Sequence, residues 1–294
     1  MKTIAGKLFT FVLFGLVVSS TLFATDYRYT KVDVPNSIAT VLRGINARGD
    51  LIGGYVDAGG VGHDFLLRNG VYTNIDYPGG AGTARAMNAR GDIVGVLDDA
   101  DGGHGFLYRE GQFTKIDFPG AIATRAFGIN NTGDITGQYT TPSGAVLGYI
   151  LRDGTFHKIH LQDTDLTSPY GAEDSGRVTV GDVVVSADSS TRGFIQNKGV
   201  VQLLDPPGTI FPCSHARGIN ERGDVAGAFM IVHAPEECTR PNHGFVLRQG
   251  EYDVIDPPGS LDTFVFGIND DGVVVGAATD NKGTVHGFKA TPKD

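Results

Sequence analysis

The chain has 294 residues, of which 43 are glycine and 13 are proline, and its formal net charge is −9 at pH 7. An acidic surface argues against nucleic acid or an anionic membrane as the main partner, because both require a basic footprint on the protein. The many glycines and prolines, without a long helical periodicity, favour a fold of many short strands joined by tight turns.

The first 24 residues differ from everything that follows. Lys2 and Lys7 give a positively charged start, residues 8–18 form an apolar run, and small residues follow at Ser19, Ser20 and Ala24. This pattern is typical of a secretory signal peptide, and the apolar run is short for a membrane span. We therefore expect residues 1–24 to be removed after Ala24 and residues 25–294 to form one secreted or periplasmic domain with no stable membrane span. An uncleaved membrane anchor is the alternative.

The rest of the chain consists of six copies of one sequence unit, at about residues 41–78, 83–119, 124–161, 167–206, 214–257 and 263–290. Each unit has an asparagine, or once a glutamate, at the end of its first apolar segment and a glycine three residues later. The markers are 42, 42, 43, 47 and 49 residues apart, at Asn46, Asn88, Asn130, Glu173, Asn220 and Asn269. A period near this length is typical of the four-stranded blades of a β-propeller.

The second unit shows the four strands that we expect in each copy. Residues 84–87 form the first, and an Asn-Ala-Arg-Gly turn leads to a β-branched second strand at residues 93–96. Residues 104–109 and 112–118 flank the dipeptide Glu110-Gly111, which is typical of a two-residue hairpin. The sequence therefore predicts an all-β, six-bladed β-propeller with four antiparallel strands per blade.

The hairpin register predicts side-chain pairs between the third and fourth strands. If Arg109 opposes Gln112, then His104 lies opposite Asp117. The same count pairs the following residues: His63 with Asp76, Arg192 with Asp205, and His243 with Asp256. Facing side chains in an antiparallel pair are close enough to bond, so we interpret the recurring pairs as structural clamps.

The last unit has His286 but no fourth strand after it. Residues 29–35 match residues 113–119 of the second unit, where the carboxylate of the clamp is Asp117. We therefore expect residues 27–34 to pair beside the last strand, so that Asp33 completes His286 and the ring of blades closes without a free edge.

The two cysteines both belong to the fifth unit. Cys213 precedes its first strand and Cys238 lies between its second and third strands, so both loops emerge on one face of a blade. With an export signal, this placement predicts a disulfide. Two unpaired thiols are the alternative.

The connections between strands differ between the two faces of the predicted propeller. The asparagine turns and two-residue hairpins scarcely vary, whereas the connections of the other face differ in length and sequence. These variable loops are residues 57–62, 98–103, 140–146, 206–214 and 230–242. Variable loops on a rigid scaffold are where binding usually resides.

Arginines recur near the predicted channel on that face. Arg43, Arg85 and Arg217 lie three residues before the marker asparagines, and Arg125 lies two residues before the equivalent Phe127. Several guanidinium groups can hold a carboxylate, sulfate or phosphate. The alternative is that these arginines stack on aromatic residues between blades. The expected partner is an extracellular ligand: a small anion, a glycan or a protein.

Other chemistry is weakly indicated. Asp98, Asp99 and Asp101 form an acidic cluster, but they lack the spacing of a calcium loop, which favours solvated surface charge. Ser214-His215 is suggestive only because a nucleophile and a base are adjacent, and the sequence has no G-x-S-x-G, H-E-x-x-H, C-x-x-C or P-loop motif. We therefore expect a binding or scaffolding module without a cofactor. A propeller hydrolase or lyase acting on extracellular carbohydrate is the alternative.

The repeated His-Gly-Phe triplets resemble the HAF family of bacterial extracellular repeats. They lie at residues 104–106, 243–245 and 286–288, and the repeated Gly-Asp-Ile-Val-Gly element matches as well. The sequence departs from the pattern at Asp64, Leu147, Glu173 and Arg192. The resemblance implies an exported repeat protein and no particular activity.

Overall fold

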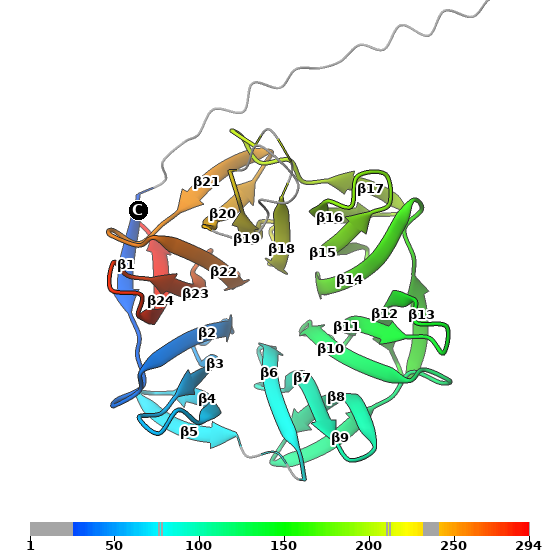
Figure 1. The fold of residues 1–294 in the computed structure, drawn as a ribbon, viewed down its shortest axis with the longest axis horizontal. Helices are drawn as coiled ribbons and strands as arrows, with labels where there is room; N and C mark the ends of the chain where they lie inside the picture. Colours follow the sequence, from blue (N-terminus) through cyan, green and yellow to red (C-terminus); the bar gives the residue numbers. More distant parts are fainter. Residues whose placement is uncertain are drawn as a thin grey trace, which may run out of the picture.

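A computed structural model describes residues 26–75, 77, 79–209, 211, 213–231 and 241–293. Every helix or strand assigned within these ranges is a β-strand, so the all-β prediction is confirmed for them. The strands lie around a central axis, and β2, β6, β10, β14, β18 and β22 are nearest to it (Figure 1). The predicted signal peptide, Asp76 and Cys238 lie outside the described residues.

Three sheets are antiparallel meanders of four strands. The first contains β2 (Ala39–Ile45), β3 (Leu51–Val56), β4 (Gly62–Arg68) and β5 (Val71–Ile75). The second contains β18 (Ser214–Ile219), β19 (Val225–Phe229), β20 (His243–Arg248) and β21 (Glu251–Ile255). The third contains β22 (Asp262–Ile268), β23 (Val274–Thr279), β24 (Val285–Pro292) and β1 (Tyr27–Lys31).

The fourth sheet has 12 strands and consists of three more such meanders. They are β6 (Ala81–Met87), β7 (Ile93–Asp99), β8 (Gly102–Arg109) and β9 (Gln112–Ile116); β10 (Ala123–Ile129), β11 (Ile135–Thr140), β12 (Val146–Arg152) and β13 (Thr155–Ile159); and β14 (Thr164–Ala172), β15 (Val178–Val185), β16 (Thr191–Asn197) and β17 (Val200–Leu203). Single parallel bridges, Gly103 with Ala123 and Val146 with Leu166, join the meanders.

The N-terminal strand β1 completes the sheet that contains the C-terminal strand β24. Tyr27 pairs with Pro292 and Lys31 pairs with Phe288, in an antiparallel register (Figure 1). Beyond the ladder, the amide of Val32 donates to the carbonyl of Gly287 at 2.8 Å. The outer edge of β24 is therefore paired rather than exposed.

The innermost strand of each meander has a β-bulge at one repeat position. In β2, for example, Leu42 pairs with Gly53 and Gly44 pairs with Ile52, which leaves Arg43 without a partner in the ladder. The bulged residues are Arg43, Arg85, Phe127, Tyr170, Arg217 and Phe266. A bulge bends its strand and re-aims a side chain, and here it turns these residues toward the axis.

A glycine on the adjacent strand makes room for each bulge. A Cβ atom at Gly53 would lie 2.1 Å from the carbonyl oxygen of Val41, and one at Gly95 would lie 2.1 Å from that of Thr83. No side chain tolerates such a contact with backbone. The glycine that ends the repeated Gly-Asp-Ile-Val-Gly element is therefore explained by close approach of the neighbouring strand.

The hydrophobic core lies between neighbouring meanders. One cluster joins Ile52 and Ile75 of the β2–β5 sheet to Ala84 and Phe106 of the next meander, and all four side chains are buried. Because each meander buries apolar surface only against its neighbours, the repeats stabilise one another.

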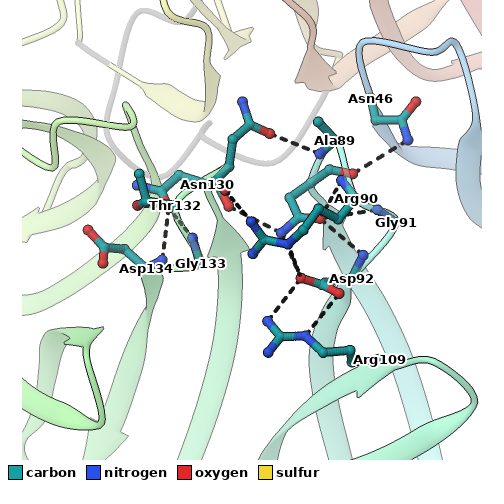
Figure 2. Close-up of polar contacts among 12 residues, drawn as sticks. Asn46, Ala89, Arg90, Gly91, Asp92, Arg109, Asn130, Thr132, Gly133 and Asp134 are labelled. Carbon is teal, nitrogen blue, oxygen red and sulfur yellow. Dashed lines mark hydrogen bonds and ion pairs between the residues drawn. The ribbon is translucent and has the colours of Figure 1, made fainter.

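The marker asparagines join neighbouring meanders by hydrogen bonds. Asn88 accepts from the amides of Arg90 and Asp92 within its own turn, and its amide group donates to the carbonyl of Asn130 at 3.3 Å. Asn46 donates to the carbonyl of Asn88 in the same way, at 3.4 Å (Figure 2). The asparagine therefore caps its own turn and contacts the next one, which explains its recurrence.

A buried aspartate anchors arginines under these turns. Asp92 accepts hydrogen bonds from Arg90 at 3.1 Å and from Arg109 at 3.0 and 2.9 Å (Figure 2). Burial alone would raise the pKa of Asp92, but hydrogen bonds from Arg109 and Asn88 outweigh it and hold this pKa below its usual value. The carboxylate is therefore a charged, fully bonded group of the scaffold.

Candidate functional site

An axial cavity of about 240 Å³ lies where the innermost strands meet. Three successive residues from each of these strands line it: Arg43–Ile45, Arg85–Met87, Phe127–Ile129, Tyr170–Ala172, Arg217–Ile219 and Phe266–Ile268. The first residue of each triplet is the bulged one. The bulges therefore place three arginines and three aromatic residues around one space.

The cavity is layered along the axis. The second residue of each triplet is glycine or alanine, and the third residues form an apolar layer of Ile45, Met87, Ile129, Ala172, Ile219 and Ile268. These apolar residues also line a second, smaller cavity of about 90 Å³, together with the marker asparagines. The apolar layer thus separates the arginine end of the axis from the asparagine end.

Arg217 is paired with a buried carboxylate. Its Nη2 lies 2.8 Å from Oδ2 of Asp182, which also lies 2.9 Å from Nδ1 of His215. The guanidinium carbon of Arg217 lies 3.9 Å from the centre of the Tyr170 ring. Burial disfavours the charge of Arg217, but the attraction of Asp182 and Tyr170 outweighs this effect and raises its pKa.

Arg43 has a buried carboxylate of its own. Its Nη1 donates to Oδ1 of Asp64 at 2.7 Å, and the other oxygen of Asp64 accepts from the hydroxyl of Tyr77 at 2.8 Å and the amide of Ala84 at 2.6 Å. Asp64 stands at a repeat position that is glycine in the other five units. The departure therefore supplies a counter-ion for an arginine of the cavity.

Arg85 differs from both. No hydrogen bond or ion pair joins it to the described residues. Its Nε is buried without a partner, as is that of Arg217, but Arg217 has the ion pair with Asp182. Its guanidinium carbon lies 5.9 Å from the centre of the Phe127 ring. Burial and the nearby charges of Arg43 and Arg217 lower the pKa of Arg85, although Tyr170 and Asp64 partly offset them. The site therefore has a surplus of positive charge centred on Arg85.

Comparison of the repeats explains why Arg85 is unpaired. Asp182 lies on the second strand of the meander before Arg217, and Gly54 occupies the equivalent position before Arg85. Asp64 bonds the amide of Ala84 as Asp182 bonds the amide of Ala216, but its remaining oxygen is turned to Arg43. A Cβ atom at Gly54 would lie 2.6 Å from Arg43 Nη1, so this pair occupies the space of a side chain there.

Arg125, the fourth predicted ligand-binding residue, does not line the cavity. Its guanidinium lies 3.4 Å from Asp98, which belongs to β7. The bulge at Phe127 interrupts the alternation of β10, so residues 125 and 127 no longer share a face of the strand. The sequence does not show this change, because a bulge depends on the hydrogen-bond ladder.

The predicted cross-strand partners lie within bonding distance where both are described. Nδ1 of the histidine lies 2.6 Å from the aspartate for His104 and Asp117, 2.7 Å for His243 and Asp256, and 2.8 Å for His286 and Asp33. Arg192 lies 3.8 Å from Asp205 and closer, at 2.6 Å, to Asp188. His63 contacts Asp57 at 3.1 Å, and its predicted partner Asp76 is outside the described residues.

Two of these histidines have a second carboxylate that sequence reasoning missed. Nε2 of His104 lies 3.3 Å from Asp99, and Nε2 of His286 lies 3.3 Å from Asp280. Asp99 also lies 2.7 Å from Nζ of Lys115, so the acidic cluster of the second unit is partly neutralised. Within the described ranges no group of acidic, histidine and cysteine side chains is arranged to hold a metal ion.

Ser214 and His215 do not form a nucleophile and base pair. The Ser214 hydroxyl is buried, donates to the carbonyl of Leu204 at 2.6 Å and accepts from the amide of Gly193 at 3.0 Å. The neighbouring His215 contacts Asp182 instead. The preceding Cys213 is buried, and because Cys238 is not described, the predicted disulfide stays a prediction.

Comparison with known proteins identifies the fold type. No known protein-family model matches the sequence, and no curated protein matches it. Among solved structures, a gluconolactonase from Xanthomonas campestris has a TM-score of 0.54 and 13% identity over 92% of this chain and 91% of that one.

Two further structures are similar. A lectin from Aleuria aurantia bound to Fucα1-6GlcNAc has a TM-score of 0.51 and 9% identity over 88% of this chain and 93% of its own. TolB from Acinetobacter baumannii has a TM-score of 0.51 and 12% identity over 79% of this chain and 60% of its own. These similarities show a β-propeller type of fold and nothing about activity. Among the residues that the structure describes, no helix is long and apolar enough to span a membrane.

Proposed function

We propose that this chain is an exported six-bladed propeller that acts as a binding module and holds a small anionic ligand in its axial cavity. The count of six is supported by the strand pairings, which group into six four-stranded meanders. Closure by the N-terminal strand is supported by the pairing of β1 with β24 and by the contact of Asp33 with His286.

One observation carries the ligand assignment: three arginines line one cavity, and only two have a carboxylate partner. Arg43 and Arg217 contact Asp64 and Asp182, whereas Arg85 has neither an ion pair nor a hydrogen bond to a described residue. Arg85 is half-buried with its Nε removed from solvent, and a cation withdrawn from water is costly unless it is paired. An anion that enters the cavity supplies the missing charge, and the guanidinium group offers it a planar set of donors.

Stacking of the arginines on aromatic residues was the alternative, and it accounts for part of the arrangement. Arg217 lies over Tyr170 at 3.9 Å, as stacking requires. The 5.9 Å between Arg85 and the Phe127 ring is near the outer limit of such a contact and leaves the charge of Arg85 uncompensated. Stacking therefore orients the side chains, and the ligand completes the charge balance.

Calorimetric titration of the purified protein with acetate, benzoate, sulfate and phosphate at low ionic strength tests this proposal. We expect saturable binding of one anion per chain, weakened by at least about tenfold in Arg85→Gln, which corresponds to about 1.4 kcal/mol. Arg125→Gln removes a charge outside the cavity and should leave binding unchanged. Equal binding by Arg85→Gln and the native protein, or no anion binding at all, would contradict the proposal.

Export and membership of the HAF family belong to the same proposal. The sequence of residues 1–24, with its charged start and apolar run, supports export, and the His-Gly-Phe triplets support the family resemblance. Mass spectrometry of protein from an exporting host should find an N-terminus at Thr25 and, without reduction, a peptide pair that joins Cys213 to Cys238. A retained Met1 or two alkylated thiols would contradict these parts separately.

A further inference from the structure

We infer that the axial ligand is a monoanion with a flat apolar body, such as an aromatic monocarboxylate, rather than a doubly charged anion such as sulfate. This inference rests on the proposed function and specifies the ligand of the same site. It follows from three properties of the cavity: its net charge, the chemistry of its wall and its small volume.

The net charge favours a single negative charge on the ligand. The charged residues among those that line the cavity are Arg43, Arg85 and Arg217. Behind them lie two buried carboxylates, Asp64 at 2.7 Å from Arg43 and Asp182 at 2.8 Å from Arg217. The five groups sum to one positive charge. A monoanion neutralises it, whereas a dianion leaves a buried negative charge beside two carboxylates, which is unfavourable.

The wall of the cavity is built from planar groups. Phe127 and Tyr170 are stacked, with ring centres 4.6 Å apart and an angle of 15° between their planes. Arg217 continues this stack over Tyr170, and Phe266 is stacked on Phe264 at 4.6 Å. Aromatic faces next to a guanidinium group favour a ligand with a planar apolar body and a charged end.

The shape of the cavity limits the size of the ligand. Its volume of about 240 Å³ is at the small end for ligand sites, which commonly measure about 300–1,000 Å³. The apolar layer that includes Ile45, Met87 and Ile268 forms its floor, so the body of a ligand contacts apolar atoms there. At this floor a strongly hydrated dianion such as sulfate would meet apolar atoms in place of part of its water. The cavity therefore suits a single small molecule.

The test varies the charge and the apolar body of the ligand independently, in calorimetric titrations of the purified protein at pH 7.5. Benzoate is the flat monoanion, acetate lacks the body, phthalate adds a second charge to the same ring, and sulfate is a dianion without a body. We expect benzoate to bind at least about tenfold more tightly than each of the other three. Equal or tighter binding of phthalate or sulfate would overturn the inference while leaving an anion site in place, whereas no binding of any probe would overturn the proposed function itself.

Two variants test the charge balance directly. Asp64→Asn and Asp182→Asn each remove one buried negative charge and keep the shape of the side chain, so the net charge of the site becomes +2. In each variant the ratio of phthalate to benzoate affinity should rise at least about tenfold, whereas Asp98→Asn, outside the cavity, should leave the ratio unchanged. Circular dichroism identifies folded variants, and either one suffices for the test. An unchanged ratio in a folded variant would overturn the inference.

Discussion

Replacing Asp33 with asparagine should weaken the attachment of the N-terminal segment to β24 by removing one charged clamp. Asp33 lies 2.8 Å from Nδ1 of His286, accepts from the amide of Gly287 at 3.2 Å and lies 3.1 Å from Nζ of Lys31. It joins residues that are 253 positions apart in the chain. The side chains of Asp33 and His286 are 27% and 20% exposed, so solvent screens their interaction only in part.

The magnitude follows from this geometry. A hydrogen bond to a charged group contributes about 1.5–3 kcal/mol when buried, and partial exposure lowers this to about 1–2 kcal/mol. For a domain of this size, a loss of 1 kcal/mol lowers Tm by about 2–4 °C, so Asp33→Asn should lower Tm by roughly 2–8 °C. Differential scanning calorimetry measures the change, and hydrogen exchange should become faster in β1 and β24.

The matched control is Asp117→Asn. Asp117 bonds His104 at 2.6 Å in the equivalent position of an internal hairpin, where the partners are 13 residues apart. Faster exchange should therefore be confined to β8 and β9, because no chain terminus is released. A Tm of Asp33→Asn within about 1 °C of the native value, with unchanged exchange in β1, would refute the idea that this clamp holds the ends together.

The remaining predictions concern the scaffold. Asp92→Ala should lower the free energy of unfolding in urea by about 3 kcal/mol, which is at the low end for a broken buried ion pair because Arg90 and Arg109 are 51% and 46% exposed. The control Asp98→Ala removes an exposed ion pair and should cost less than about 1 kcal/mol. Equal costs for the two variants would contradict the assignment. The folded pKa of Asp92 lies below the unfolded value of 3.8, so the stability that its carboxylate contributes is present above about pH 4 and is lost as pH falls through the folded pKa. In Asp92→Asn the free energy of unfolding should therefore fall less steeply with decreasing pH than in the native protein. Gly53→Ala should lower the free energy of unfolding by about 3 kcal/mol or more, or prevent folding, because its Cβ would lie 2.1 Å from the backbone oxygen of Val41. At Gly54, by contrast, the new methyl group would meet only the side-chain ends of Arg43 and Asp64. A stable Gly53→Ala protein would contradict the steric account.

Local features of the sequence predict the strand pattern and the clamps. The hairpin at Glu110-Gly111 places Arg109 opposite Gln112 and Gly105 opposite Ile116. One position further, His104 contacts Asp117 at 2.6 Å. Such a count succeeds because the side-chain alternation of an uninterrupted strand is regular. The same count applied along the bulged strand β10 wrongly groups Arg125 with Phe127.

The partners of the cavity arginines depend on packing between meanders. Asp182 and Arg217 are 35 positions apart and come from different sheets, and Asp64 reaches both Arg43 in its own sheet and the amide of Ala84 in the next. The one sequence signal that points to this arrangement is the departure of Asp64 from the repeat. This departure indicates that a side chain has space at this position, but the sequence does not indicate which other side chain it contacts.

For this protein, the sequence by itself determined the repeat period, the strand order and the hairpin partners, because these depend on the spacing of nearby residues, which is similar in every repeat. Only the tertiary structure decided which side chains meet at the axis and which of them has no counter-ion among the described residues. The physical reason is that a bulge is a property of the hydrogen-bond ladder between two strands, and that charge balance at the axis sums contributions from several sheets, so neither can be read from one repeat.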